Sequence, residues 1–343
     1  MGLSTYDGGM LPSPWRITFI TNPDECNLRC PMCASHSDEA RAFRPAAPLR
    51  RLALNDVIRA IDSLSSPPIE VIPSTRGEPL LWDGLPGLAE ACGARSISLN
   101  VTTNGSFPGR GAEGWARILC PVSSDVKVSW GSATPWLDAE LIGGRDHVRA
   151  LADLRTFVRV RDETAAAGGN RCGVTLQVAA RSENVGELPA LARLAAAEGL
   201  DRVKVNHLQL HFPSLEASSL RCSPEAVRRW NEAVRAAHDA ATTNSRRGGG
   251  EVSLVGLVEL PENGGAPLWD CPFAGREAWV DVNGAYLPCP APAAREGRLG
   301  HLGSLREGTI AEAWSAPAWR AVGDGWKDLA PCGDCAFRSP GGA

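Results

Sequence analysis

The sequence has no long hydrophobic segment and no strongly charged tract. No window approaches the run of about 18 apolar residues that a membrane-spanning helix needs. The polar start, MGLSTYDGG, lacks the charged and apolar regions of a secretory signal. With 35 basic and 39 acidic residues the net charge is −4, and there is neither a basic stripe nor an acidic tail. We therefore expect a cytoplasmic protein that binds neither nucleic acid nor membranes.

Cysteine, in contrast, is abundant. The chain of 343 residues contains 11 cysteines, and seven of them fall into two clusters. In a cytoplasmic chain, clustered cysteines more often bind metal or carry out redox chemistry than form disulfides. The two clusters are therefore the first candidates for functional sites.

Most of the chain alternates between strand and helix patterns. The predicted strands are 16–21, 69–73, 96–102, 125–130, 173–179 and 202–207, and the clearest helices are 54–64, 85–92, 145–167, 187–199 and one that begins at Ser223 and Pro224. Six such units predict an α/β fold, a partial (β/α)6 TIM-type barrel, with its chemistry at the C-terminal ends of the strands.

The C-terminal part differs in kind. A polar, glycine-rich segment at 242–251 is interpreted as a linker between a barrel domain, 1–241, and a small domain, 252–343. Asn283-Gly284 between two short alternating runs predicts a β-hairpin. Thr309 and Glu312 predict a capping box for a helix over 310–322. A hairpin and a helix bury little core, so this unit needs a covalent or metal staple.

The first cysteine cluster is Cys26, Cys30 and Cys33, in the loop after the first strand. A structural zinc site normally has four protein ligands, and His36 is the only nearby candidate for a fourth. Three thiolates suit a [4Fe–4S] cluster that leaves one iron open for a ligand. The second cluster comprises Cys271, Cys289, Cys332 and Cys335. Its four thiolates predict a closed site, for which zinc and an iron–sulfur cluster both remain possible.

CxxxCxxC after the first strand resembles the signature of the radical S-adenosylmethionine (SAM) superfamily, and TRGEP (75–79) resembles its GGEP motif with Arg76 in place of the first glycine. The resemblance implies a [4Fe–4S] cluster on Cys26, Cys30 and Cys33 together with bound SAM. It also implies that Glu78 and the neighbouring backbone hold the SAM amino group, Ser129 the ribose and Arg181 the carboxylate. The complete set of cofactor-binding residues implied in this way is Met32, Arg76, Gly77, Glu78, Pro79, Asn104, Ser129 and Arg181.

The second cluster resembles the "twitch" form of the SPASM domain. That resemblance implies one auxiliary [4Fe–4S] cluster with four protein ligands, which would be Cys271, Cys289, Cys332 and Cys335. A zinc staple is the alternative.

Several stretches, among them TNPDECNLRCPMC and CPFAGREAWVDVNG, resemble twitch enzymes that tailor aminoglycosides and related sugar antibiotics. That group includes dehydrogenases and epimerases, and in the epimerases a donor cysteine follows the hairpin cysteine. Here Pro290 follows Cys289, which favours a dehydrogenase that oxidises a secondary alcohol of an aminocyclitol or aminoglycoside-type sugar. An epimerase with Cys222 or Cys120 as donor is the alternative, and a peptide-modifying maturase ranks third. The implied partners are a small carbohydrate or aminocyclitol and a flavodoxin- or ferredoxin-type electron donor.

Four residues are candidates for contact with the substrate. Lys204, His207 and His211 lie at or after the end of the sixth strand, at the edge of a barrel that faces the substrate. Cys222 directly precedes a helix, and a helix N-terminus lowers the pKa of a thiol. These four are the predicted catalytic residues.

Overall fold

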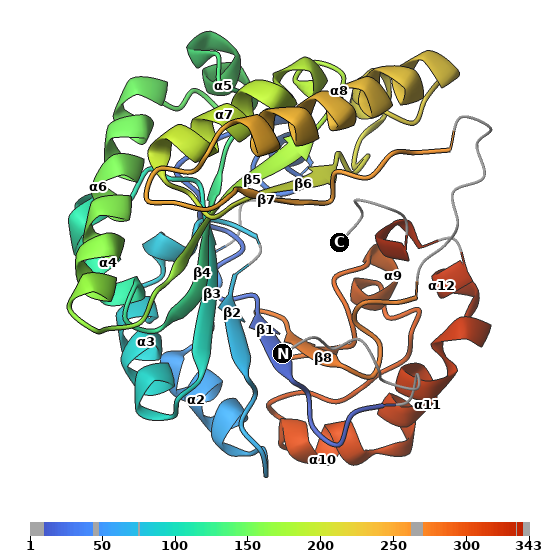
Figure 1. Cartoon of the computed structure of the whole chain (residues 1–343). Coiled ribbons are helices and arrows are strands. Elements are labelled where there is room, and N and C mark those ends of the chain that lie inside the picture. The colour runs from blue at the N-terminus through green and yellow to red at the C-terminus, as the bar shows by residue number, and fades with distance from the viewer. Residues whose placement is uncertain (1–9, 44–47, 75, 262–269, 334, 339–343) are drawn as a thin grey trace.

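The computed structural model describes residues 10–43, 48–74, 76–261, 270–333 and 335–338. Within these ranges the centre of the protein is a nine-stranded sheet with the order β7-β6-β5-β4-β3-β2-β1-β8-β9 (Figure 1). Every pair of neighbouring strands is parallel except the antiparallel pair β8–β9. The strands are β1 (Arg16–Phe19), β2 (Glu70–Pro73), β3 (Ser98–Thr103), β4 (Ser123–Ser129), β5 (Gly173–Ala180), β6 (Arg202–His207), β7 (Ser253–Val255), β8 (Glu277–Val280) and β9 (Tyr286–Leu287).

This arrangement confirms the predicted partial barrel. Strands β1 to β6 are neighbours in chain order, as expected when each parallel strand returns through a helical crossover. The structure adds two parallel neighbours that the sequence did not predict, because β7 extends the sheet beyond β6 and β8 pairs with β1. Strands β7 and β8, which follow the six predicted barrel strands in the sequence, therefore belong to the same sheet.

Helices cover the outer face of the sheet, at the left and top of Figure 1. Alternate strand residues such as Ile17, Val71 and Val126 point toward them and are fully buried in one continuous apolar core. Ser223 caps the last of these helices and Pro224 is its first residue, as predicted. The helices of this part are α1 (Asp38–Ala42), α2 (Leu54–Asp62), α3 (Leu85–Ala94), α4 (Gly111–Leu119), α5 (Pro135–Leu141), α6 (His147–Ala166), α7 (Leu188–Glu198) and α8 (Pro224–Thr243).

The inner face of the sheet is polar near the N-terminal ends of the strands. Arg16 forms ion pairs with Glu70 at 3.1 Å and with Glu277 at 2.9 Å, which links β2, β1 and β8. Across the barrel, Arg202 pairs with Asp125 at 3.1 Å. These charged side chains pair with one another inside the barrel, and the main apolar core packs between the sheet and its helices and continues into the C-terminal segment.

The C-terminal segment packs beside β1, at the right of Figure 1. The predicted hairpin forms as β8 and β9, and Asp281 Oδ1 accepts hydrogen bonds from the backbone N–H groups of Asn283 (2.9 Å) and Ala285 (2.7 Å) in its turn. The capping box of Thr309 and Glu312 is present. The helix predicted over 310–322 is divided at Pro317, because proline cannot continue a helix. The helices here are α9 (Pro292–Arg295), α10 (Ile310–Ser315), α11 (Pro317–Gly325) and α12 (Ala330–Gly333).

The predicted domain division at 242–251 stays a prediction. Helix α8 continues to Thr243, inside the predicted linker, and β7 begins just after it at Ser253. Because β7 pairs with β6 and β8 pairs with β1, both ends of the partial barrel are extended by strands of the second predicted domain.

Candidate functional site

The first cysteine loop lies at the C-terminal end of β1. Cys26, Cys30 and Cys33 are free thiols and are partly buried. Burial raises the pKa of Cys30 to about 12, and the neighbouring thiols Cys33 and Cys26 add to the shift. The backbone N–H groups of Ser35 and His36 donate to Cys33 Sγ at 3.4 and 3.3 Å. The three thiols therefore share one neighbourhood, with amides directed at sulfur.

His36 does not join the three thiols as a fourth donor. It is buried, and its Nε2 lies 2.9 Å from the backbone oxygen of Pro23, to which it donates. Burial lowers the pKa of His36 from its usual value. The loop thus offers three protein donors, as its spacing predicted.

The second cysteine set comes together from the start, the hairpin and the end of the C-terminal segment. Burial raises the pKa of Cys289 to about 12, and Cys271, Cys335 and Cys332 add to the shift. The backbone N–H of Ala274 donates to Cys271 Sγ at 3.4 Å. Four free thiols therefore face one another at this end of the molecule.

Each set fits an iron–sulfur cluster in the chemistry of its donors. Among the described residues, no group of three or more His, Cys, Asp or Glu side chains is placed so that it could hold a metal ion as it stands. Three free thiols in the first set and four in the second are nevertheless the soft donors that such clusters require.

A cavity of about 130 Å³ lies beside the first cysteine loop, at the C-terminal ends of β4, β5 and β6. Met32, Ser129 and Arg181, three of the residues implied to contact SAM, all line it. Arg181 is only 5 % exposed, and its Nε atom has no hydrogen-bond partner among the described residues. Its ion pair with Glu183 is long, at 3.6 Å. A buried guanidinium with an unused donor is suited to bind the carboxylate of a ligand.

A buried ion pair that the sequence analysis missed supports this cavity. Asp138 is fully buried and accepts two hydrogen bonds from Arg145 Nη2, at 2.7 and 2.8 Å. Arg145 Nη1 donates to the backbone oxygens of Asn104 (2.9 Å) and Ser129 (2.7 Å). Its guanidinium also lies over the Trp130 ring, 4.3 Å from the ring centroid. The pair thereby joins the ends of β3 and β4 at the rim of the cavity.

The Gly77-Glu78-Pro79 turn holds the first cysteine loop in place. Gly77 has φ +78°, and a Cβ at this position would come within 2.4 Å of Asn22 O and 2.6 Å of Glu25 O. The Glu78 carboxylate is buried and accepts hydrogen bonds from the Asn104 backbone N–H (2.7 Å) and the Thr103 hydroxyl (2.8 Å). Burial raises the pKa of Glu78 to about 7, against the effect of these bonds. Glu78 thus connects the turn to the end of β3, and Pro79 begins a short 3₁₀ helix, Pro79–Leu81.

Asn104 lies against the first cysteine loop. Its Nδ2 atom donates to Asn27 Oδ1 at 2.8 Å and lies 3.9 Å from Cys26 Sγ. The predicted cofactor-binding residue is therefore placed beside one of the predicted cluster ligands.

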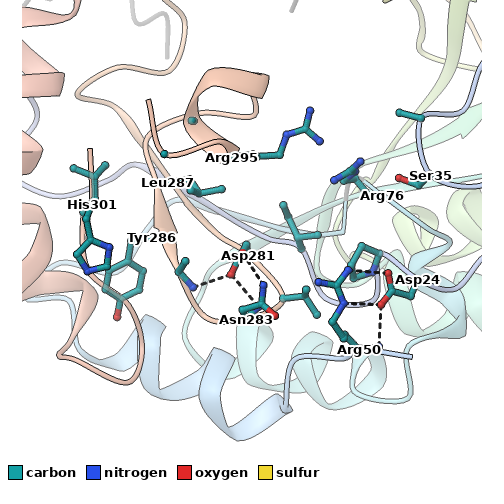
Figure 2. Close-up of a pocket in the computed structure, with 18 of the residues that line it drawn as sticks. Asp24, Ser35, Arg50, Arg76, Asp281, Asn283, Tyr286, Leu287, Arg295 and His301 are labelled. Atoms are coloured by element: carbon teal, nitrogen blue, oxygen red, sulfur yellow. Dashed lines mark hydrogen bonds and ion pairs between the residues drawn. The ribbon is translucent and has the colours of Figure 1, made fainter. Parts of the chain in front are cut away.

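Arg76 lies elsewhere. It lines a larger cavity, of about 610 Å³, between the first cysteine loop and the C-terminal hairpin (Figure 2). The other walls come from Asp24 and Ser35 of the cysteine loop, Asp281 and Tyr286 of the hairpin, and the helix α9. Arg76 is absent from the residues that line the smaller cavity beside Met32. Its side chain therefore does not support the predicted contact with SAM.

Lys204 and His207 point to opposite faces of β6. The Lys204 ammonium shares the inner face with Arg16, Lys127 and Asp125, and burial lowers its pKa to about 8. His207 packs outward against Trp230 of α8, with 4.3 Å between the ring centroids. Both ring nitrogens of His207 are buried and have no hydrogen-bond partner among the described residues, and burial lowers its pKa to about 3. Lys204 therefore faces the interior of the barrel and His207 does not, and neither residue lines either of the two cavities.

The last two predicted catalytic residues lie near the surface. His211 is exposed in the loop after β6, where partial desolvation and then the charges of Arg295 and Arg76 lower its pKa. Cys222 is also exposed, and its Sγ donates to Ser219 O at 3.0 Å. Neither residue lines either of the two cavities.

The fold and the two cysteine sites define a class: a partial (β/α) barrel with an open thiol site in the loop after β1 and a second thiol site in a C-terminal domain. Residues 271–336 match the SPASM family model, described as an iron–sulfur cluster-binding domain. This range contains all four cysteines of the second set, so the match favours the cluster over the zinc alternative.

Two relatives are GTP 3′,8-cyclases. One from Pseudomonas aeruginosa is 28% identical over 242 residues, covering 70% of this chain and 67% of that protein. One from Caulobacter vibrioides is 28% identical over 215 residues, covering 61% of this chain and 57% of that protein. The matched part thus spans little more than half of the second relative.

Solved structures share the fold. SuiB of Streptococcus suis bound to S-adenosylmethionine is 18% identical with a TM-score of 0.65, over 91% of this chain and 68% of that one. The structure described as anSMEcpe with bound AdoMet is 14% identical with a TM-score of 0.61, over 96% of this chain and 85% of that one. The C-terminal part of this chain thus matches an iron–sulfur cluster-binding domain, and its fold is shared with proteins whose structures contain bound S-adenosylmethionine. Within the part of the chain that the structure describes, no helix is both long and apolar enough to cross a membrane.

Proposed function

We propose that the chain is a radical SAM dehydrogenase that oxidises a secondary alcohol of an aminocyclitol or aminoglycoside-type sugar intermediate to a ketone in antibiotic biosynthesis. When bound, SAM and the first cluster supply a 5′-deoxyadenosyl radical that removes a hydrogen atom from a C–H bond, and the second cluster accepts an electron. The observation that carries the proposal is the pair of thiol sites on opposite sides of the larger cavity. Ser35 follows Cys33 by two residues, Leu287 precedes Cys289 by two, and both line that cavity.

The smaller cavity supplies the contacts to SAM in this proposal. Arg181 binds the carboxylate with its buried guanidinium, Ser129 meets the ribose and Met32 the adenine. Gly77 and Glu78 act mainly by holding the cysteine loop against β3, and the backbone of their turn faces the amino group. The ion pair of Arg145 and Asp138 holds the ends of β3 and β4 together beside this cavity.

Oxidation is favoured over epimerisation because an epimerase must return a hydrogen atom. Neither cavity has a cysteine among its described lining residues. Cys120 is buried, Cys222 bonds to the Ser219 carbonyl, and Pro290 follows Cys289. An alcohol that has lost a hydrogen atom and has no nearby thiol donor can instead lose a proton and an electron, which yields the ketone.

In this proposal Lys204 accepts that proton, although it lines neither of the two cavities. It pairs in register with Gln177 of β5, and Gln177 lines the smaller cavity. Because burial lowers the pKa of Lys204 to about 8, a substantial fraction of the amine is neutral in mildly alkaline solution. The remaining part of the proposal, a flavodoxin- or ferredoxin-type reductant, concerns only the delivery of electrons to the first cluster.

The test is an anaerobic reaction of the reconstituted enzyme with SAM, a reductant and a panel of aminocyclitol and amino-sugar intermediates in D2O, followed by mass spectrometry. A product two mass units lighter, formed in step with 5′-deoxyadenosine, would establish the dehydrogenase. A product of substrate mass plus one deuterium would instead establish an epimerase. A Cys332→Ala variant should still cleave SAM but yield no ketone, whereas Cys30→Ala should abolish both.

The relatives suggest a second candidate, a cyclisation of a nucleotide. The two GTP 3′,8-cyclases match 70% and 61% of this chain at 28% identity. GTP therefore belongs in the same panel. Its conversion to an isomer of unchanged mass, with none of the sugars consumed, would favour that candidate over the dehydrogenase.

A further inference from the structure

Two arginines extend into the larger cavity from opposite walls. Arg76 projects from the turn after β2, and Arg295 projects from α9 in the C-terminal segment. In Figure 2 the two guanidinium groups point toward the same part of the cavity. The charges of both arginines also reach the exposed His211, whose pKa is lowered first by desolvation and then by Arg295 and Arg76.

The two acidic residues that line this cavity have hydrogen-bond partners of their own. Asp24 accepts from Arg50 Nε at 2.8 Å, Arg50 Nη2 at 3.1 Å and the Arg50 backbone N–H at 3.0 Å. Asp281 accepts hydrogen bonds within the hairpin turn, from Asn283 and Ala285 (Figure 2). Arg76 and Arg295 bring two positive charges to the part of the cavity between them.

Arg76 also departs from the family pattern. The motif that TRGEP resembles has glycine at this position, and the side chain here leaves the predicted SAM site for the larger cavity. Guanidinium groups present several donors in a planar fork that matches the oxygens of phosphate and carboxylate. A cationic amino sugar alone would be repelled by such a pair.

We propose that Arg76 and Arg295 bind an anionic group of the substrate, a phosphate or a carboxylate, so that the sugar or cyclitol enters this cavity as an acidic derivative. This inference rests on the proposed function, because it assigns the larger cavity to the substrate. It narrows the substrate class from amino sugars in general to those that also carry phosphate, nucleotide or carboxylate.

The test is a calorimetric titration of the reconstituted enzyme with SAM bound, using glucose 1-phosphate, glucuronate and glucosamine as probes. We expect one of the two acidic probes to bind at least about tenfold more tightly than glucosamine, and which one binds identifies phosphate or carboxylate. Arg76→Ala and Arg295→Ala should each lower the affinity for that probe by about tenfold to a hundredfold. Arg76→Gly restores the motif glycine and should weaken the probe equally while the affinity for SAM is retained.

The matched control is Arg298→Ala. Arg298 lies near α9 in the same segment, is exposed, and pairs with Glu296 at 2.9 Å. Its loss should leave the affinity for the acidic probe unchanged. The inference is overturned if both acidic probes bind no better than glucosamine at millimolar concentration, or if Arg76→Ala and Arg295→Ala bind like Arg298→Ala.

Reductive cleavage of SAM, measured on the same samples, separates the two proposals. If wild-type enzyme forms 5′-deoxyadenosine but binds neither acidic probe, the anionic substrate class is wrong and the radical SAM assignment stands. If it binds an acidic probe but forms no 5′-deoxyadenosine, the proposed function fails while the anion site stands.

Discussion

The buried pair of Asp138 and Arg145 gives the sharpest prediction about the structure of the site. Asp138 is 0 % exposed and Arg145 is 4 % exposed, so neither charge is solvated in the folded protein. Asp138→Asn preserves the size of the side chain and removes its charge. The Arg145 guanidinium then stays buried beside Trp130 without a counter-charge.

The expected cost follows from this burial. Removing one partner of a buried ion pair typically costs about 3–5 kcal/mol, because the remaining charge is left uncompensated. The Asn side chain keeps one oxygen, which can still accept from the Gly131 backbone N–H, now 2.8 Å from Asp138 Oδ1. We therefore expect Asp138→Asn to lower the free energy of unfolding by about 3–4 kcal/mol, a large share of the 5–15 kcal/mol that is typical for the unfolding of a whole protein.

The assay is urea unfolding followed by tryptophan fluorescence. A loss of that size should lower the midpoint by about 1 M. The control is Glu163→Gln, which breaks the exposed pair between Arg159 and Glu163 on α6. Exposed pairs contribute about 0–1 kcal/mol, so this midpoint should hardly move.

A binding measurement adds a second readout. Because Arg145 donates to the Ser129 and Asn104 carbonyls, Asp138→Asn should also weaken the binding of SAM, while Glu163→Gln should not. Equal midpoints for Asp138→Asn and Glu163→Gln would refute the reasoning, since the buried pair would then contribute no more than a surface pair.

Three further predictions concern other parts of the site. The pKa of Lys204 is lowered to about 8, so turnover should rise as the pH passes through about 8 and the amine becomes neutral. The variant Lys204→Arg keeps its charge and should turn over slowly at every pH. An unchanged pH profile of turnover in that variant would exclude Lys204 as the base. His207→Phe should keep turnover within about twofold and leave stability unchanged or raised by about 1 kcal/mol, because it removes two unpaired buried nitrogens. The folded-state pKa of His207, about 3, lies below its unfolded value, so His207 lowers stability as the pH falls below 6.5; the variant should unfold less readily in acid, and a loss of turnover by orders of magnitude would restore the catalytic role. Gly143→Ala places a Cβ 2.6 Å from the backbone nitrogens of Arg29 and Cys30 and should lower the iron content and the absorbance near 400 nm. The control Gly144→Ala has a similar positive φ but no atom within 4 Å of its Cβ, so it should lower neither. Equal iron content in the two variants would contradict the contact argument.

The sequence alone was sufficient for the features that depend on short spacing. The first thiol site depends only on the spacing within one loop, that of Cys26, Cys30 and Cys33. The hairpin at Asn283-Gly284 and the helix cap at Ser223 likewise depend on a few neighbouring residues. The order of the strand–helix units also predicted the partial barrel, because parallel strands with helical crossovers have few ways to pack.

The pairing of distant segments could not be found in this way. Strand β8 lies beside β1, and the Arg145 guanidinium joins Asp138 to the carbonyls of Asn104 and Ser129, without any local signal in the residues involved. These contacts depend on register and packing over the whole barrel. All eight predicted SAM contacts, Arg76 among them, came from the resemblance, but only the fold shows that the Arg76 side chain lines a different cavity.

The clearest division lies within a single strand. The alternation of side chains in β6 already requires Lys204 and His207 to face opposite sides, because successive residues of a strand point in opposite directions. It does not say which side is the inside of the barrel. That is decided by α8, whose Trp230 covers the outer face and buries His207, and by the inward charges of Arg16 and Asp125 around Lys204. The sequence by itself determined the cysteine chemistry and the kind of fold, while tertiary packing decided which polar side chains reach the site.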